Sequence, residues 1–425
     1  MIEGEPVLVL HKRTAKRPAG PTCVDLFSGA GGLAIGFRQA GWAILAANDI
    51  DVAAGQTFRS NFPESAFFEG PISELNAKTV LTECNLRRGE LDCLIGGPPC
   101  QSFSHNNHQR SASDARARLF EDYLRLVKGL QPKTLVMENV PGILSIDGGS
   151  VMREIELQLG GLGYATTYRV LSAEEFGTPQ LRRRVFIVAS RIGDAASLLP
   201  LPTHASAWRH SATIRATIKR QKRASVITVQ SAIGDLPMIE NGGGEQSVRR
   251  PPTAPTTTYQ RSIRKGARIL YNHVCHTLTD VNLNRLVHVP EGGNWRDIPQ
   301  DLLTAGMKRA KPSDHTKRYG RLARTGLAST ILTKCDPHWG AYIHPIQNRT
   351  ISVREAARLQ GFPDSFRFAG SEISKQYEQV GNAVPIPVAR ALGVATRCHL
   401  AASRAFGLDP AECDSAPAIA GRRAA

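Results

Sequence analysis

The chain has 425 residues, of which 41% are hydrophobic, and it carries a formal net charge of +16. This length and composition can supply a buried core spread over two or three domains. No apolar run reaches the roughly 18 residues of a membrane-spanning helix, and the N-terminus lacks the apolar segment of a signal peptide. We therefore expect a cytoplasmic protein with no membrane partner.

The first half of the chain alternates between apolar strands and amphipathic helices. The sequence predicts strands at residues 22–27, 42–49, 91–95, 134–140 and 183–190, with helices at 33–41, 52–60, 115–130 and 150–162. Strands separated by helices favour an α/β fold built on a doubly wound, mainly parallel sheet.

The composition changes after Arg191, where proline, threonine, glycine and arginine become frequent and helical periodicity weakens. We expect a flexible basic arm at residues 1–20, a first domain at 21–192, a second and loop-rich domain at 193–375, a segment at 376–402 that returns to the first domain, and a disordered tail at 403–425.

Positive charge is concentrated in the second of these domains. Residues 205–335 hold 22 Lys and Arg against 8 Asp and Glu, a net charge of +14 out of the +16 of the whole chain. A solubilising surface would also be basic, but such segregation favours a polyanionic partner, and nucleic acid above all.

Eight cysteines are scattered along the chain without a CxxC pair, which argues against a structural zinc site. His273, Cys275 and His276 contain metal-ligating types, but their spacing is not that of a known site. We expect no metal.

A glycine-rich turn follows the first predicted strand. Gly29, Gly31 and Ala34 fit the pattern GxGxxA, and Asp49 ends the second strand, where an acid can accept hydrogen bonds from a ribose. This pattern indicates a cofactor that contains adenosine. By itself it would suit a nicotinamide-dependent oxidoreductase equally well.

Reactive residue types stand at the ends of the other strands, where ligands of an open α/β sheet bind. They are Cys100 after two prolines, Glu138, and the pair Arg182 and Arg184. Each has an ordinary alternative, as a turn cysteine, a helix cap or surface arginines. Their joint occurrence favours a thiol, a carboxyl and guanidiniums that meet around one polar heterocycle.

The ordered segments resemble those of the bacterial DNA cytosine-5 methyltransferases. The matching segments are DLFSGAGGL, ANDID, GGPPCQSFS, DARARLF, MENV, GTPQLRRRVFIVAS, SVREAARLQGFP and QVGNAVP, and they run from about Thr22 to Leu400. The resemblance implies a Rossmann-like sheet that binds S-adenosylmethionine at residues 21–192 and 376–402, and a target recognition domain at 193–375.

The resemblance also implies the chemistry. Cys100 would attack carbon 6 of a cytosine flipped out of double-stranded DNA, and so activate carbon 5 for methylation. Glu138 would bind ring nitrogen 3 and the exocyclic amine, Arg184 would hold the 2-carbonyl oxygen, and Arg182 would support the site or a phosphate. S-Adenosyl-L-homocysteine would be the product, and the polar loop at 101–118 would close over the DNA.

The cofactor-binding residues implied by the same resemblance lie in several segments. They are Phe27, Gly29, Ala30, Gly32, Asp49, Ile50, Ile72, Pro99, Leu119, Asn382 and Val384. Two positions depart from the family pattern. Pro71 replaces an aspartate that accepts from the adenine amine, which leaves Ile72 and shape to hold adenine or weakens binding, and Ile386 replaces a proline with little expected effect.

Two segments of the second domain, residues 314–326 and 333–340, are predicted to contact DNA, although Cys335 and His338 would equally suit packing positions. A tRNA cytosine-5 methyltransferase is the alternative within the same chemistry, but its members largely lack the long variable domain. A non-catalytic relative is disfavoured because Cys100, Glu138 and Arg184 are all present. We expect a monomer, with a cognate restriction endonuclease as a functional partner.

Overall fold

The computed structural model describes residues 7–16, 19–98, 117–206, 223–249, 253–311 and 313–405. Its main feature is an eight-stranded sheet in the order β1-β4-β3-β2-β5-β6-β8-β7. The strands are β1 (Val9–His11), β2 (Thr22–Leu26), β3 (Ala43–Asp49), β4 (Ala66–Glu69), β5 (Cys93–Gly96), β6 (Thr134–Asn139), β7 (Ala165–Ser172) and β8 (Arg183–Ser190). A separate hairpin joins β9 (Gly244–Arg249) to β10 (Ile269–Val274).

The helices follow the same chain order. They are α1 (Gly32–Gln39), α2 (Val52–Asn61), α3 (Ala77–Cys84), α4 (Ala117–Leu130), α5 (Ser150–Gly161), α7 (Val229–Ile233), α8 (Thr258–Ile263), α9 (Asp280–Leu286), α10 (Ala305–Arg309), α11 (Val353–Leu359), α12 (Ile373–Asn382) and α13 (Ile386–Ala405). Short 3₁₀ turns are η1 (Ile72–Glu74), η3 (Pro141–Leu144), η4 (Ile146–Gly149), η5 (Ala173–Phe176), η6 (Ala195–Leu198), η7 (Trp295–Asp297) and η8 (Gln300–Leu302).

The sheet is parallel at its centre and antiparallel at both sides. Strands β4, β3, β2, β5 and β6 run parallel, whereas β1 pairs antiparallel with β4, and β8 pairs antiparallel with both β6 and β7. The expected doubly wound α/β sheet is therefore confirmed, with an antiparallel β7–β8 pair added at one side. Strand β1 lies inside the segment that we expected to be a flexible arm, so Val9–His11 corrects that expectation.

Central strands read as continuous apolar runs because both of their faces are buried. In β5, Cys93 and Ile95 join one hydrophobic cluster, while Leu94 between them joins the other. Successive side chains of a strand point to opposite faces of the sheet, so one strand contacts a layer of helices on each face. Helices α3, α4 and α5 contribute to one layer, and α1 and α13 to the other.

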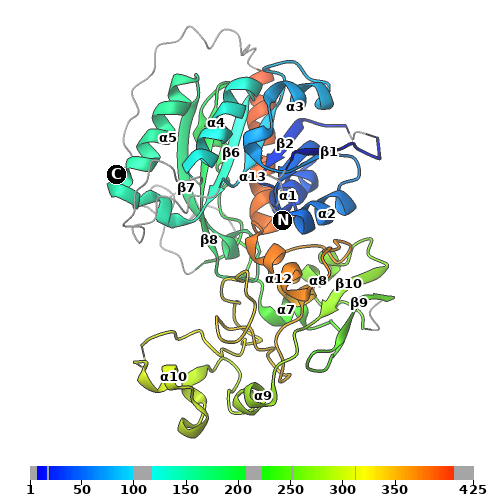
Figure 1. Cartoon of the computed structure of the whole chain (residues 1–425), viewed down its shortest axis with the longest axis vertical. Helices are drawn as coiled ribbons and strands as arrows, with labels where there is room; N and C mark the ends of the chain where they lie inside the picture. Colours follow the sequence, from blue (N-terminus) through cyan, green and yellow to red (C-terminus); the bar gives the residue numbers. More distant parts are fainter. Residues whose placement is uncertain are drawn as a thin grey trace, which may run out of the picture.

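The C-terminal helix α13 is built into the first lobe by close packing against α1. Glycines permit this approach, because a Cβ at Gly36 would lie 2.3 Å from the Cβ of Ala389, and a Cβ at Gly393 would lie 2.9 Å from that of Ala40. Figure 1 shows α13 running alongside the sheet in the upper lobe, so the chain returns there after it has built the lower lobe.

The lower lobe holds α7 to α10 and the β9–β10 hairpin (Figure 1). Its interior continues the first lobe's hydrophobic cluster through residues such as Val229, Leu270 and Ile331, and a second cluster surrounds Leu286 and Trp295. Buried ion pairs also hold this part of the chain, notably Arg358 with Asp235 and Asp364, and Arg349 with Glu355 at 2.7 Å.

The two expected boundaries of the second domain do not coincide with breaks in the packing. Turn η6, just after residue 192, packs against β8 and α13 of the first lobe. Residue 375 falls within α12, which packs against α11. The lobes therefore share core residues where the chain passes between them.

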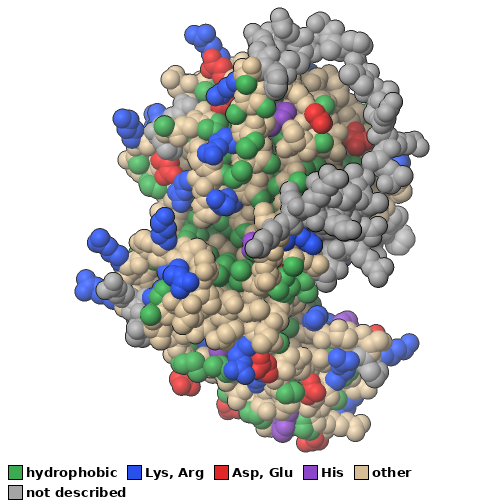
Figure 2. All heavy atoms as spheres, turned by 180° about the vertical axis from the view of Figure 1, so that it is seen from behind, with side chains coloured by type: hydrophobic (Ala, Val, Ile, Leu, Met, Phe, Trp, Pro, Cys, Tyr) green, Lys and Arg blue, Asp and Glu red, His purple; other side chains and the backbone are tan. Residues whose placement is uncertain are grey.

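Part of the positive charge counted in residues 205–335 lies inside the protein. Arg321 is buried and donates hydrogen bonds to four backbone carbonyls, and Arg264 pairs with Asp235 at 2.8 Å. On the face shown in Figure 2, Lys and Arg side chains lie on both lobes. The charge excess of the sequence therefore overstates the basic surface of the lower lobe.

Candidate active site

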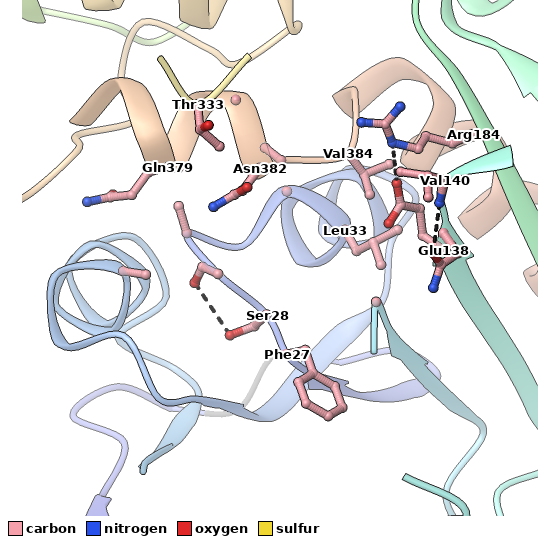
Figure 3. Close-up of a pocket in the computed structure, with 18 of the residues that line it drawn as sticks. Phe27, Ser28, Leu33, Glu138, Val140, Arg184, Thr333, Gln379, Asn382 and Val384 are labelled. Carbon is pink, nitrogen blue, oxygen red and sulfur yellow. Dashed lines mark hydrogen bonds and ion pairs between the residues drawn. The ribbon is translucent and has the colours of Figure 1, made fainter. Parts of the chain in front are cut away.

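A cavity of about 800 Å³ opens where several strands of the parallel sheet end. Its wall is formed by residues at the ends of four strands or just after them. They are Phe27 to Ala30, Gly32 and Leu33 after β2, Asp49 and Ile50 at the end of β3, Gly97 and Pro98 after β5, and Glu138 to Val140 at the end of β6. The opposite wall comes from Ile331 to Thr333 and from α12 and the residues after it. Figure 3 shows Thr333, Gln379 and Asn382 across the cavity from Phe27 and Ser28.

The turn after β2 requires an unusual backbone. Phe27, Gly29 and Gly31 all have positive φ, of 55°, 53° and 94°. This left-handed region costs a residue with a bulky side chain more than it costs glycine, so Phe27 is held there by its surroundings. At Gly32 a Cβ would lie 3.0 Å from both the Cβ of Ala383 and the backbone nitrogen of Val384. Glycine here lets the turn approach the segment that follows α12.

Asp49 fixes this turn from the neighbouring strand. Its carboxylate accepts hydrogen bonds from the backbone N–H of Gly29 at 2.7 Å and of Asp51 at 2.9 Å. Burial raises the pKa of Asp49, and these two N–H groups oppose the rise. The carboxylate retains acceptor positions for a ligand, because two oxygens can accept about four hydrogen bonds.

Asp25 is a site residue that the sequence analysis did not single out. Its side chain lines the cavity and is fully buried, and neither carboxyl oxygen has a hydrogen-bond partner among the described residues. Burial raises the pKa of Asp25 to about 8, with a further rise from the charge of Asp49, and the nearby backbone N–H of Ala34 opposes it. The sequence feature that could have pointed to Asp25 is an aspartate inside the otherwise largely apolar strand TCVDL.

Glu138 and Arg184 form an ion pair in the cavity wall. The Arg184 Nε lies 2.8 Å from the Glu138 Oε1 (Figure 3), and both side chains are largely buried. Burial raises the pKa of Glu138, whereas Arg184 and Arg182 lower it. The net rise makes the protonated carboxyl more accessible, which suits a group that must donate to, as well as accept from, a ligand.

Arg182 lies beside this pair but is held by the backbone. It is 3% exposed, and it donates at 2.9 Å to the carbonyls of Ile331 and Gly381. Burial lowers its pKa to about 9, with Arg184 adding to the fall and Glu138 opposing it. Through these two hydrogen bonds, Arg182 connects the start of β8 to the lower lobe and to the end of α12.

The proline-rich turn after β5 is anchored by Asn139, which donates from Nδ2 to the Pro98 carbonyl at 2.9 Å. Cys100, Pro99 and the loop at 101–116 lie outside the described residues. Pro98, two positions before Cys100, lines the cavity.

The cavity gathers most of the other residues expected to bind a cofactor. Its lining includes Phe27, Gly29, Ala30, Gly32, Asp49, Ile50, Asn382 and Val384. Ile72 and Leu119 are absent from that lining and instead contribute to the hydrophobic cluster under α3 and α4. Pro71 precedes η1, and Ile386 is buried at the start of α13, where its N–H donates to the Gln360 carbonyl.

The histidine and cysteine group of the lower lobe has packing and hydrogen-bonding roles. His273 bonds to Ser352 and the Pro237 carbonyl, Cys275 donates to the Glu240 carbonyl, and His276 stacks on Tyr377. Within the described ranges, no three His, Cys, Asp or Glu side chains gather as a metal site, and no helix could cross a bilayer.

Comparisons with known proteins agree with this geometry. The profile of the C-5 cytosine-specific DNA methylase family matches residues 22–397. The type II methyltransferase M.AgeI of Thalassovita gelatinovora is 32% identical, over 87% of this chain and 97% of that protein. The DNA (cytosine-5)-methyltransferase PliMCI of Paracentrotus lividus is also 32% identical over 88% of this chain, which spans 28% of that longer protein.

A solved E. coli structure, assigned as a DNA modification methyltransferase encoded within a prophage, has the same fold, with a TM-score of 0.67 and 26% identity over 92% of this chain and 99% of that one. Neither the comparisons nor the fold favours the oxidoreductase alternative. The chain belongs to the C-5 cytosine-specific DNA methylase family, and it methylates carbon 5 of cytosine in DNA.

Proposed function

We propose that the cavity binds S-adenosylmethionine beside the glycine-rich turn and a flipped-out cytosine beside Glu138 and Arg184. The observation that carries this proposal is that the ion pair and the turn line one continuous cavity. A methyl donor and a base that occupy such a cavity together can react without water between them.

The residues of the turn fit such a cofactor. The buried carboxyl of Asp25, which has no hydrogen-bond partner in the described structure, suits a ligand that carries positive charge, and S-adenosylmethionine has both a sulfonium and an ammonium group. Asp49 would hold the ribose hydroxyls, and Ile50 would pack on adenine. Asn382 and Val384 would close the cavity from the opposite wall. When bound, the cofactor supplies an electrophilic methyl group.

The protein's own groups make the cytosine reactive. The Cys100 thiolate attacks carbon 6 of the ring, which breaks its aromaticity and gives carbon 5 the character of an enamine carbon. Glu138 binds nitrogen 3 and the exocyclic amine, and Arg184 holds the 2-carbonyl oxygen, so that both stabilise the charge that develops on the ring. After methylation, loss of the carbon 5 proton expels the Cys100 sulfur and restores aromaticity.

Arg182 is a positioning residue in this scheme. Because it donates hydrogen bonds to the carbonyls of Ile331 and Gly381, it would hold the lower lobe and the end of α12 in a fixed position relative to Arg184, two residues away. Asn139 plays a similar part for the turn that leads to Cys100, through its bond to Pro98.

The lower lobe would recognise the DNA sequence around the target cytosine. Extrusion of that cytosine from double-stranded DNA costs a few kcal/mol, which contacts with the flanking duplex offset. Basic side chains of segments 314–326 and 333–340 would hold phosphates. The similarity to a type II methyltransferase supports a companion restriction endonuclease and a role in the cytoplasm, where both enzymes meet DNA.

Methyl transfer from labelled S-adenosylmethionine to DNA and to tRNA tests the proposal. We expect incorporation into DNA, its complete loss in Cys100→Ala, and wild-type activity in Cys398→Ala, which removes an exposed cysteine on α13 as a matched control. S-Adenosylhomocysteine should bind Cys100→Ala as it binds the wild type. Normal turnover by Cys100→Ala would refute the nucleophile, and labelling of tRNA alone would refute the substrate.

A further inference from the structure

An exposed tryptophan on the lower lobe lies near two cations. The side chain of Trp339 is 52% exposed. The Lys334 ammonium lies 5.4 Å from the centre of its ring, and the Arg318 guanidinium carbon lies 5.9 Å from it. Cation–π contacts attract these side chains to the ring electrostatically, and the two cations make this site positively charged.

Hydrogen bonds stabilise the turn that carries Trp339. The backbone N–H of Trp339 donates to the Asp336 carbonyl at 2.9 Å. The His338 ring forms one hydrogen bond with the Asp336 carboxylate and another, of 2.6 Å, with the Tyr319 hydroxyl. Tyr319 is fully buried, and its own N–H donates to the Pro337 carbonyl. These bonds join the two segments, 314–326 and 333–340, and they fix the backbone of the turn that carries the ring.

The same turn is continuous with the wall of the cavity. Thr333 lines the cavity, and Lys334, the next residue, is the one that contacts the Trp339 ring. The Lys334 side chain therefore links the cavity wall to the Trp339 ring, whose centre lies 5.4 Å beyond the Lys334 ammonium. Cys335 is buried, which anchors this connection in the core.

We propose that Trp339 stacks on a DNA base that loses its neighbour when the target cytosine leaves the helix. This inference rests on the proposed function, since it requires a cytosine that leaves the duplex for the cavity, whose wall includes Thr333 of the same segment. A flat aromatic surface flanked by cations matches a nucleobase joined to phosphates, and such a stack does not depend on which base is present. Because hydrogen bonds already hold the turn that carries Trp339, DNA binding loses little conformational entropy there.

Binding to a duplex that contains the methylated site, once bisulfite sequencing of DNA from an expressing cell has identified it, tests the stack. We compare wild type, Trp339→Ala and Trp339→Phe by fluorescence anisotropy with S-adenosylhomocysteine present. Trp339→Ala should raise the Kd for DNA by about 5- to 150-fold, the usual range for loss of one base stack, and Trp339→Phe should recover most of the affinity because it keeps an aromatic face.

A second readout reports the contact itself. Trp42 and Trp295 are buried, and the fourth tryptophan, Trp208, is replaced by phenylalanine in every protein compared, so a large part of any change in tryptophan emission on DNA binding should come from Trp339 and be absent when Trp339→Phe is added. The affinity for S-adenosylhomocysteine and the Tm should be unchanged in both variants.

A Kd within twofold of wild type for Trp339→Ala would overturn the inference, as would equal losses in the Ala and Phe variants. In either case wild-type DNA binding and methylation would still stand. Failure of the wild type to bind or methylate DNA would instead refute the proposed function.

Discussion

At the scale of single residues, the buried carboxyl of Asp25 has a consequence for stability. Its pKa of about 8 in the folded protein lies above the roughly 3.9 of an unfolded aspartate, so the folded state keeps a proton that the unfolded chain has released. Its contribution to the free energy of unfolding therefore falls as the pH rises from about 4 to about 8.

Asp25→Asn removes this titration. We expect the difference in Tm, variant minus wild type and both measured without ligand, to increase as the pH rises from about 5 to about 8, because only the wild type loses the stabilising contribution of the protonated Asp25 carboxyl. A difference in Tm that stays constant over this range would show that Asp25 ionises normally.

Much of the site could be predicted residue by residue, because strand ends in an α/β sheet converge. Glu138 and Arg184 come from different strands and meet at 2.8 Å, and the glycine turn lies beside Asp49. A supporting role for Arg182 was predicted, but the partners of Arg182 and Asn139 could not be, since tertiary packing brings Ile331, Gly381 and Pro98 to them. Asp25 was missed because an acid in an apolar strand carries no pattern of its own.

At the scale of elements, the contact between α1 and α13 depends on glycine. A Cβ at position 36 would approach the Ala389 Cβ to 2.3 Å and the Arg390 nitrogen to 2.7 Å. Neither neighbour is a flexible side chain, so the helices must separate. Gly36→Ala should lower the free energy of unfolding by about 1–3 kcal/mol, as overpacking of a core does.

Gly160→Ala is the matched control for this prediction. Gly160 lies in α5, where a Cβ would meet nothing within 4 Å. This substitution should be neutral or stabilise the protein by up to about 1 kcal/mol, because alanine favours a helix over glycine. Denaturant unfolding measures both variants, and equal stability of Gly36→Ala and wild type would contradict the close packing of the two helices.

The predicted elements differ from the observed ones mainly at the edges of the sheet. Strands β2, β3, β5, β6 and β8 are apolar runs with both faces buried, and the sequence pattern found them. Strand β7 is half exposed and carries an irregular pattern, β1 is an exposed edge strand of three residues, and β4 is a run of only three apolar residues before Glu69. Such strands depend on pairing with a neighbour, which a local pattern does not reveal.

At the scale of the whole molecule, the two lobes act as one unit because they share a core. Ile331 belongs to the hydrophobic cluster that also contains Phe37 of α1, and its carbonyl binds Arg182. The amino-acid composition indicated a boundary near residue 192, but it did not predict that the two lobes share this hydrophobic core. The excess of basic residues likewise indicated a DNA-binding lobe but did not separate surface charge from buried residues such as Arg321.

The central claim is that Cys100 attacks a cytosine held by Glu138 and Arg184 in the cavity beside the glycine turn. Incubation with S-adenosylmethionine and a duplex that carries 5-fluorocytosine at the target position tests it most directly, since fluorine on carbon 5 prevents release of the enzyme. We predict a denaturant-resistant complex that requires S-adenosylmethionine, with the DNA attached to Cys100 in the peptide mass spectrum. Attachment at another cysteine, or turnover of normal DNA with no trapped complex, would contradict the account.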